Sequence, residues 1–316
     1  MSPSRKTASK ATSRAERTQR SNPQLTPVMA CDTAFRVVAR RYLGDLTANH
    51  QATCRGDPEA LHQMRIALTR LRTAISFFSP MVADTERTRI RDELKWLQTQ
   101  LGAVRDLDVA IERLKEVNNQ AHLTPNYRAW KGRRADSHRL LAGALRSIRY
   151  RRLVKSISGW IEDGPWSIKE GRQPRQRRTS PIAAYSVRKL ARWQETLLKK
   201  SRKLQIMSAK KRHRLRLLNK KLCYSIEFFS GLFSDKQSSR QQVALKYLRK
   251  AQKSLGQLND DARSEMLAAA AGRDGVRLSV PHLGRGHQKR LIRTARAAYR
   301  KLAALKSVEI PDPRLG

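Results

Sequence analysis

Residues 61–78 read LHQMRIALTRLRTAISFF, and residues 212–229 read RHRLRLLNKKLCYSIEFF. The two stretches align without a gap 151 residues apart, so that His62 matches His213 and Arg65 matches Arg216. In both, apolar residues recur at spacings of three and four, which is the period of an amphipathic helix. The sequence therefore predicts two copies of one helical unit.

A second segment repeats in the same order. Residues 101–106 read LGAVRD, and residues 255–260 read LGQLND, 154 residues further on. Weaker correspondences flank the motifs: Arg36 and Arg40 match Arg188 and Arg192, and His138 and Tyr150 match His287 and Tyr299. Two motifs repeated in one order indicate a duplicated unit and not a chance match.

The helical period extends over most of the chain, and Gly and Pro fall between the periodic segments. We expect helices at residues 30–47, 59–79, 84–118, 125–161, 182–206, 210–232, 238–271 and 287–306. The fold class is therefore predicted to be all-α, with four helices in each half.

The predicted domain boundaries follow composition. Residues 163–181 are rich in helix breakers and positive charge, which indicates a linker between a first half at 28–162 and a second half at 182–306. Residues 1–27 hold six Lys/Arg and one acid, so we expect a disordered basic tail. An organellar transit peptide is the less favoured alternative, because large apolar residues are scarce there. Residues 307–316 are expected to form a C-terminal tail.

Positive charge is spread over the whole chain. Among 316 residues, 67 Lys and Arg stand against 26 Asp and Glu, which gives a formal net charge of +41. Residues 1–180 carry +18 and residues 181–316 carry +23. Like charges at this density repel one another unless an anion is bound, so a polyanionic partner is expected. Hydrophobic residues make up 39% of the chain, enough for a core.

Cysteine usage and hydropathy indicate the compartment. The three cysteines form no CxxC pair, and their odd number argues against a complete disulfide framework. No run of 18 apolar residues exists, and the first 27 residues lack the apolar core of a secretory signal. We expect a cytoplasmic protein without a membrane span.

The repeated helix carries a stripe of cations. On a helix, His62, Arg65, Thr69 and Arg72 lie within an arc of about 80°. The second copy places His213, Arg216, Lys220 and Cys223 on the same stripe, with Arg70 or Lys221 at its margin. Arginine offers forked hydrogen bonds, lysine a mobile charge, and histidine a pKa that phosphate raises. A solvated helix face is the simpler alternative, but histidine beside arginine in both copies favours a site for a chain of phosphates.

The second motif adds an acid and a glycine in each copy. Asp106 and Asp260 follow Gly102 and Gly256 by four residues. The acids are predicted either to orient neighbouring guanidinium groups or to be ordinary helix acids. Because glycine weakens a helix relative to alanine, we expect the glycines to allow a close approach between helices.

Together these motifs resemble the CHAD domain, the conserved histidine α-helical domain, over about residues 30–306. The resemblance implies two four-helix bundles of long antiparallel helices, related by pseudo-twofold symmetry. It also implies that basic side chains of the motif helices line a channel or groove for inorganic polyphosphate. Association with polyphosphate granules is implied as well.

The resemblance also implies particular ligand contacts. Carried over residue by residue, they are His62, Arg65, Arg70, Arg72, His213, Arg216, Lys220 and Lys221, followed by Arg36, Arg40, Arg188 and Arg192. Two positions depart from the family pattern, because Thr69 and Cys223 stand where the family usually has a basic residue. Each half-site is therefore predicted to be one cation short.

Two other classes of function are compatible with a strongly basic chain. Non-specific binding of nucleic acid is the first alternative, since phosphate contacts supply most of such affinity. Aromatic residues are only 6% of the chain, however, and no helix-turn-helix or zinc-finger spacing is present. A polyphosphate-metabolising enzyme is the second alternative, but the stripes contain no carboxylates and the chain has no P-loop, HExxH or ExExK motif. We expect no catalysis, no cofactor and no metal site.

Overall fold

The computed structural model describes residues 24–117, 124–232, 235–273 and 283–305. These residues form helices and connections, with one isolated bridge between Ala30 and Pro181, so the predicted all-α fold is confirmed. The predicted tails at 1–27 and 307–316 lie outside the described residues, apart from 24–27. In chain order the helices are α2 (Cys31–Ala48), α3 (His50–Cys54), α4 (Pro58–Phe77), α5 (Thr85–Val117), α6 (Pro125–Arg146), α7 (Ile148–Asp163), α8 (Arg172–Thr179), α9 (Ile182–Ser201), η2 (Leu204–Ile206), α10 (Ala209–Phe228), η3 (Ser230–Leu232), α11 (Asp235–Arg273) and α12 (Arg285–Ala304).

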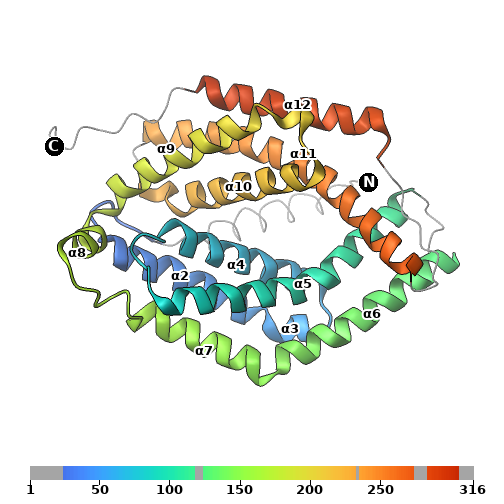
Figure 1. Ribbon diagram of the computed structural model, residues 1–316, viewed down its shortest axis with the longest axis horizontal. Helices are drawn as coiled ribbons and strands as arrows, with labels where there is room; N and C mark the ends of the chain where they lie inside the picture. Colours follow the sequence, from blue (N-terminus) through green and yellow to red (C-terminus); the bar gives the residue numbers. More distant parts are fainter. Residues whose placement is uncertain (1–23, 118–123, 233–234, 274–282, 306–316) are drawn as a thin grey trace, which may run out of the picture.

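The helices form two groups that lie against each other (Figure 1). The first group is α2 to α7, and the second is α9 to α12. The short helix α8 lies at one end, on the connection between the groups. Helices α4 and α10, which carry the repeated motif, contact each other in the middle of the molecule, and α5 contacts α11. The two copies of the motif therefore meet at the junction of the halves.

Local sequence fixes the start and the register of α4. The Asp57 carboxylate accepts hydrogen bonds from the backbone N–H groups of Glu59, at 2.8 Å, and Ala60, at 3.1 Å. Pro58 occupies the first turn, where it has no N–H to leave unpaired. Burial of Met64 and Leu68 fixes the rotation of the helix, which leaves the basic stripe half-buried at its side.

Several predicted helices end earlier than expected, and two of them show why. The segment predicted as one helix at 125–161 is divided at Ser147, which ends α6 and caps α7 by accepting from the N–H of Tyr150 at 3.2 Å. A serine at this position competes with helix continuation, because its hydroxyl satisfies a free N–H group at the next helix start. The helix predicted at 182–206 ends at Ser201 and is followed by the 3-10 turn η2.

The segment predicted as a linker, 163–181, contains a helix and is attached to the core. Arg178 is buried, and its Nη1 donates to the carbonyl oxygens of Trp166, at 3.2 Å, and Lys169, at 2.8 Å. Trp166 is itself fully buried against the ring of Phe35. The connection between the halves is therefore a packed element.

Aromatic side chains join the two motif helices at one end. Phe77, Phe78 and Phe229 are fully buried and Phe228 nearly so, and the ring centroids of Phe77 and Phe229 lie 4.8 Å apart. Aromatic rings bury large apolar areas, so this contact is a main source of adhesion between the halves.

Two hydrogen bonds between α4 and α10 join equivalent positions of the two helices. Arg70 donates to Glu227 at 3.1 Å, and Lys221 donates to Ser76 at 3.2 Å. In the alignment of the two copies, residue 70 corresponds to 221 and residue 76 to 227. A pseudo-twofold relation between the halves would produce this exchange of partners.

Candidate anion-binding site

Five basic side chains gather where α4, α5 and α10 meet, and we call them the central cluster. They are His62, Arg65, Arg105, Arg216 and Lys220. Their proximity is evident in the pKa of Lys220, which burial and the charges of Arg216 and Arg65 lower to about 8. The pKa of His62 is also lowered, first by burial and then by the charge of Arg105. Both copies of the motif thus contribute cations to one site.

The repeated glycines lie beside the repeated arginines. A Cβ atom at Gly102 would lie 3.5 Å from Nη1 of Arg65, and one at Gly256 would lie 3.8 Å from Nε of Arg216. Nη1 of Arg65 also donates to the carbonyl oxygen of Leu101 at 3.0 Å. The glycines were expected to bring helices close together; each one leaves room for the arginine side chain of the facing motif helix.

The positive charge of the central cluster is only partly compensated. Asp106 and Asp260 are the nearby acids that act on Arg65, but Asp106 is already bound to Nε of Arg263 at 2.7 Å. Arg105 forms a 3.3 Å ion pair with Glu112. Burying cations without partners is costly, because the charged form loses its hydration. The cluster therefore favours an added anion.

One buried atom of the cluster has no hydrogen-bond partner within the described residues. Nε of Arg216 is buried and makes no hydrogen bond there. A buried N–H group without an acceptor costs roughly 1–3 kcal/mol. A phosphate oxygen is an acceptor that a guanidinium group binds strongly, and it would remove this cost.

The two histidines differ in their surroundings. His62 is half-buried beside Arg105, whereas His213 is exposed and its Nδ1 donates to Oδ1 of Asn259. Arg105 and Asn259 occupy the same position of the LGAVRD and LGQLND motifs. Sequence reasoning missed Arg105 as a site residue, although its place in a repeated motif was a usable signal.

Arg70, Arg72 and Lys221 flank the central cluster. Arg70 is paired with Glu227, and its guanidinium lies over the rings of Tyr42 and Tyr224. Lys221 lies over the ring of Trp193, 5.9 Å from the centroid. Arg72 is half-buried, and its pKa is lowered by burial and then by the charge of Arg91. Trp193 and Arg91 were not among the predicted site residues.

The four remaining predicted residues lie elsewhere. Arg36 donates to the carbonyl oxygen of Glu162 at 3.0 Å, and Arg40 is ion-paired with the carboxylate of Glu162, so both are held against α7. Arg188 and Arg192 are exposed on α9. The structure does not bring these four arginines into the central cluster.

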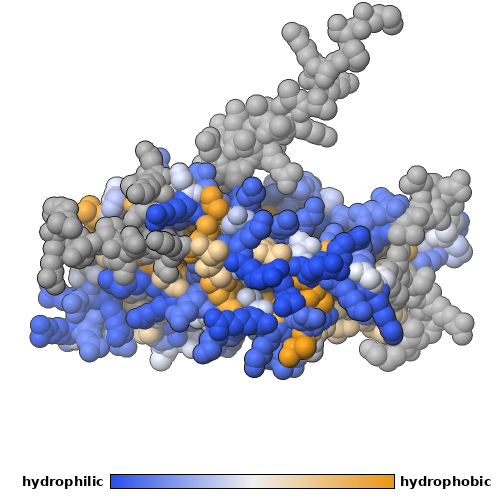
Figure 2. All heavy atoms as spheres, turned by 90° about the horizontal axis from the view of Figure 1, so that it is seen from above, coloured by the Kyte–Doolittle hydropathy of each residue, from blue (hydrophilic) through white to orange (hydrophobic). Residues whose placement is uncertain are grey.

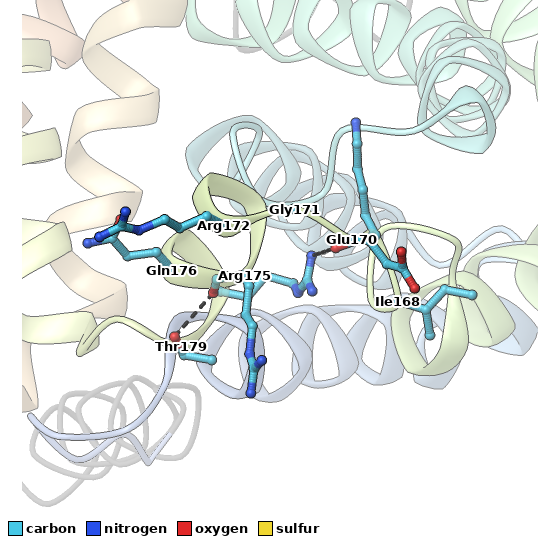
Figure 3. Close-up of a pocket in the computed structure, with 9 residues that line it drawn as sticks. Ile168, Glu170, Gly171, Arg172, Arg175, Gln176 and Thr179 are labelled. Atoms are coloured by element: carbon cyan, nitrogen blue, oxygen red, sulfur yellow. Dashed lines mark hydrogen bonds between the residues drawn. The ribbon is translucent and has the colours of Figure 1, made fainter.

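The molecule has a further pocket outside the central cluster. Figure 3 shows a pocket beside α8, lined by Arg172, Arg175 and Thr179 among others, which no residue of the central cluster lines. From above, the surface is mostly hydrophilic with small hydrophobic areas (Figure 2). Within the described part of the chain, His, Cys, Asp and Glu form no group that could hold a metal ion. None of the described helices is apolar enough over sufficient length to cross a membrane.

Fold and site together define an all-α protein in which two helical halves bury cations at their junction. The family model of the CHAD domain matches residues 37–269, and the chain belongs to this family, which is associated with binding of polyphosphate.

Solved structures support the assignment. The crystal structure of the CHAD domain from the plant Ricinus communis is 25% identical, with a TM-score of 0.68, and the match covers 91% of this chain and 92% of that one. PptA from Streptomyces chartreusis is 16% identical, with a TM-score of 0.56 and coverage of 87% and 95%, and it shows a shared fold. No curated protein matches the chain.

Proposed function

We propose that the protein binds inorganic polyphosphate at the central cluster and performs no catalysis on it. The observation that carries the proposal is the placement of the half-buried Arg65, Arg216 and Lys220 together, with the buried Nε of Arg216 unpartnered among the described residues. A row of phosphates supplies one charge after another, and each can accept a forked hydrogen bond from arginine. The basic channel or groove that the family resemblance implies is expected between α4, α5 and α10.

The shape of the ligand favours polyphosphate over nucleic acid. Cations that are half-buried between helices are accessible to a slim chain of phosphates, whereas duplex DNA carries its phosphates on the outside of a wide cylinder. Among the tryptophans, Trp130, Trp160 and Trp166 are buried and offer no stacking platform for single-stranded bases. The net charge of +41 still provides non-specific attraction to DNA.

Binding without catalysis is supported by the ion pairs that the nearby acids form with arginines. Asp106 is engaged by Arg263 and Glu112 by Arg105. Phosphoryl transfer usually depends on carboxylates that hold metal ions beside the phosphates. In the described residues, the acids near the cluster are placed to compensate arginine charge.

A competition titration with a matched variant tests the function. Long-chain polyphosphate is titrated calorimetrically into the protein, with duplex DNA as competitor at equal phosphate concentration. We expect Arg216→Ala to weaken binding about tenfold or more, because a charge-assisted hydrogen bond is lost. Arg151→Ala removes the same charge from the exposed side of α7 and should leave affinity nearly unchanged. Absence of binding by the unaltered protein, or displacement of polyphosphate by DNA, would refute the proposal.

In the cell, the proposed role is that of a cytoplasmic protein at polyphosphate granules. Long chains in a granule present many equivalent binding segments, which favours retention of a protein that binds short stretches. Fluorescence microscopy of the tagged protein should show it on granules, and the Arg216→Ala protein spread through the cytoplasm.

A further inference from the structure

The internal repeat places two surfaces at corresponding positions beside the central cluster. The Glu227 face consists of Arg70, Tyr224, Glu227 and Arg249, with the buried ring of Tyr42 beneath Arg70. The Trp193 face consists of Arg72, Ser76, Arg91, Lys189, Trp193 and Lys221. In the aligned copies, Arg70 corresponds to Lys221 and Glu227 to Ser76. The two faces thus hold corresponding residues of the repeat but differ in chemistry.

The Glu227 face is internally neutralised. The Glu227 carboxylate accepts from Arg70 at 3.1 Å and from Arg249 at 3.0 Å. Arg70 is also enclosed by the rings of Tyr42, at 5.5 Å, and Tyr224, at 5.3 Å. Both cations already have a carboxylate partner, and that carboxylate repels an approaching anion.

The Trp193 face has a neutral hydroxyl where the other face has a carboxylate. Nζ of Lys221 donates to Oγ of Ser76 at 3.2 Å, and this neutral partner does not compensate the ammonium charge. Lys221 and Lys189 lie 5.9 and 6.0 Å from the ring centroid of Trp193. Within the described chain, Arg72, Arg91, Lys189 and Lys221 make no salt bridge. This face therefore presents uncompensated cations to solvent.

The basic stripe reaches the Trp193 face but not the Glu227 face. On α4 the stripe runs from His62 and Arg65 past Thr69 to Arg72, whose neighbours include Arg91 and Lys221. On α10 the corresponding position is Cys223, which is buried, and Glu227 follows one turn later. Cations continue outward from the central cluster along one helix only.

We propose that a polyphosphate chain held at the central cluster leaves it across the Trp193 face alone, so that the bound chain runs in one direction. This inference rests on the proposed function. The segment beyond the central cluster contacts Arg72, Arg91 and Lys221, with Lys189 at the margin. Long chains gain these contacts, whereas tripolyphosphate fits within the central cluster and does not.

Matched substitutions on the two faces test the direction. Arg91 on α5 and Arg249 on α11 are both exposed arginines, one on each face. We expect Arg91→Ala to weaken binding of long-chain polyphosphate about threefold, which is typical of one exposed charge contact, and to leave tripolyphosphate binding unchanged. Arg249→Ala should leave binding of both ligands unchanged.

Exchange of the two partner residues gives a stronger test. Ser76→Glu places a carboxylate beside Lys221, as Glu227 stands beside Arg70, and should weaken long-chain binding about tenfold without affecting tripolyphosphate. Glu227→Ser should strengthen long-chain binding, because it uncovers Arg70 and Arg249. Thermal unfolding of each variant verifies that it is folded.

The outcomes separate the inference from the proposed function. If the unaltered protein binds both phosphates and the Arg216→Ala protein loses both, the central site stands. If under those conditions Arg91→Ala and Ser76→Glu leave long-chain binding unchanged, or Arg249→Ala weakens it equally, the single direction is wrong. If the unaltered protein binds neither phosphate, both proposals fall.

Discussion

Lys220 shows how a single residue couples proton binding to ligand binding. Burial and the neighbouring arginines lower its pKa to about 8, because the charged form loses hydration and is repelled. A bound phosphate would reverse the repulsion and raise this pKa toward its ordinary value. The complex should therefore hold more protons than the free protein at a pH slightly above 8.

This proton uptake is measurable. At about pH 8.5, calorimetric titration with polyphosphate in buffers of different ionisation enthalpy should show uptake of protons upon binding. The Lys220→Met protein should take up fewer. Equal uptake by both proteins would mean that Lys220 does not face the ligand.

The same residue affects stability with a definite sign. The folded-state pKa of Lys220 is about 8, below the 10.5 of an exposed lysine, so the unfolded chain binds more protons between these values. The free energy of unfolding should rise with pH across this window, and the full penalty is present at pH 7. In urea unfolding, Lys220→Met should therefore be more stable than the unaltered protein at pH 7, with a difference that shrinks toward pH 10. Lower stability of the variant at pH 7 would contradict this account.

At the scale of single side chains, the sequence predicted which cations share a stripe but not the partner of each one. The repeated stripe singled out His62, Arg65, Arg216 and Lys220, which the structure brings together. Arg36 and Arg40 were predicted from the weaker correspondence that flanks the motifs, yet Glu162 of a distant helix engages both. The local sequence pattern does not reveal an ion-pair partner on another helix, because only tertiary packing brings the two side chains together.

At the scale of elements, the apolar period located most helices but not every helix end. Residues 125–161 have an uninterrupted helical pattern, and the break at Ser147 arises from one hydroxyl that caps α7. A side chain that caps a new helix can end the preceding one even where the apolar pattern continues. The spacing of apolar residues alone therefore does not predict the break. Likewise α8 forms in a segment full of breakers, because Arg178 attaches it to two backbone carbonyls.

The capping role of Ser147 is directly testable. Ser147→Ala should lower the free energy of unfolding by about 1 kcal/mol, the usual cost of a lost N-cap, and leave polyphosphate affinity unchanged. Ser158→Ala, at an exposed position within α7, is the matched control and should have little effect or stabilise slightly. Chemical denaturation compares the two. Equal effects would show that the hydroxyl at Ser147 does not hold the junction of α6 and α7.

At the scale of the whole molecule, net charge and a defined binding site would bind a polyanion in different ways. A net charge of +41 attracts any polyanion from every side, and this attraction weakens steeply with salt. The central cluster instead joins cations from both halves at one place. The proposed function requires that the affinity for polyphosphate depends on where the cations lie and not only on their total number.

Two double variants with the same net charge test this requirement most directly. Arg216→Ala with Lys220→Met removes two cations from the central cluster, and Arg151→Ala with Lys250→Met removes two exposed ones from α7 and α11. Calorimetric titration with long-chain polyphosphate at one fixed salt concentration compares them. We expect a loss of affinity of about a hundredfold for the first protein and little change for the second. Equal losses in the two proteins would contradict this expectation.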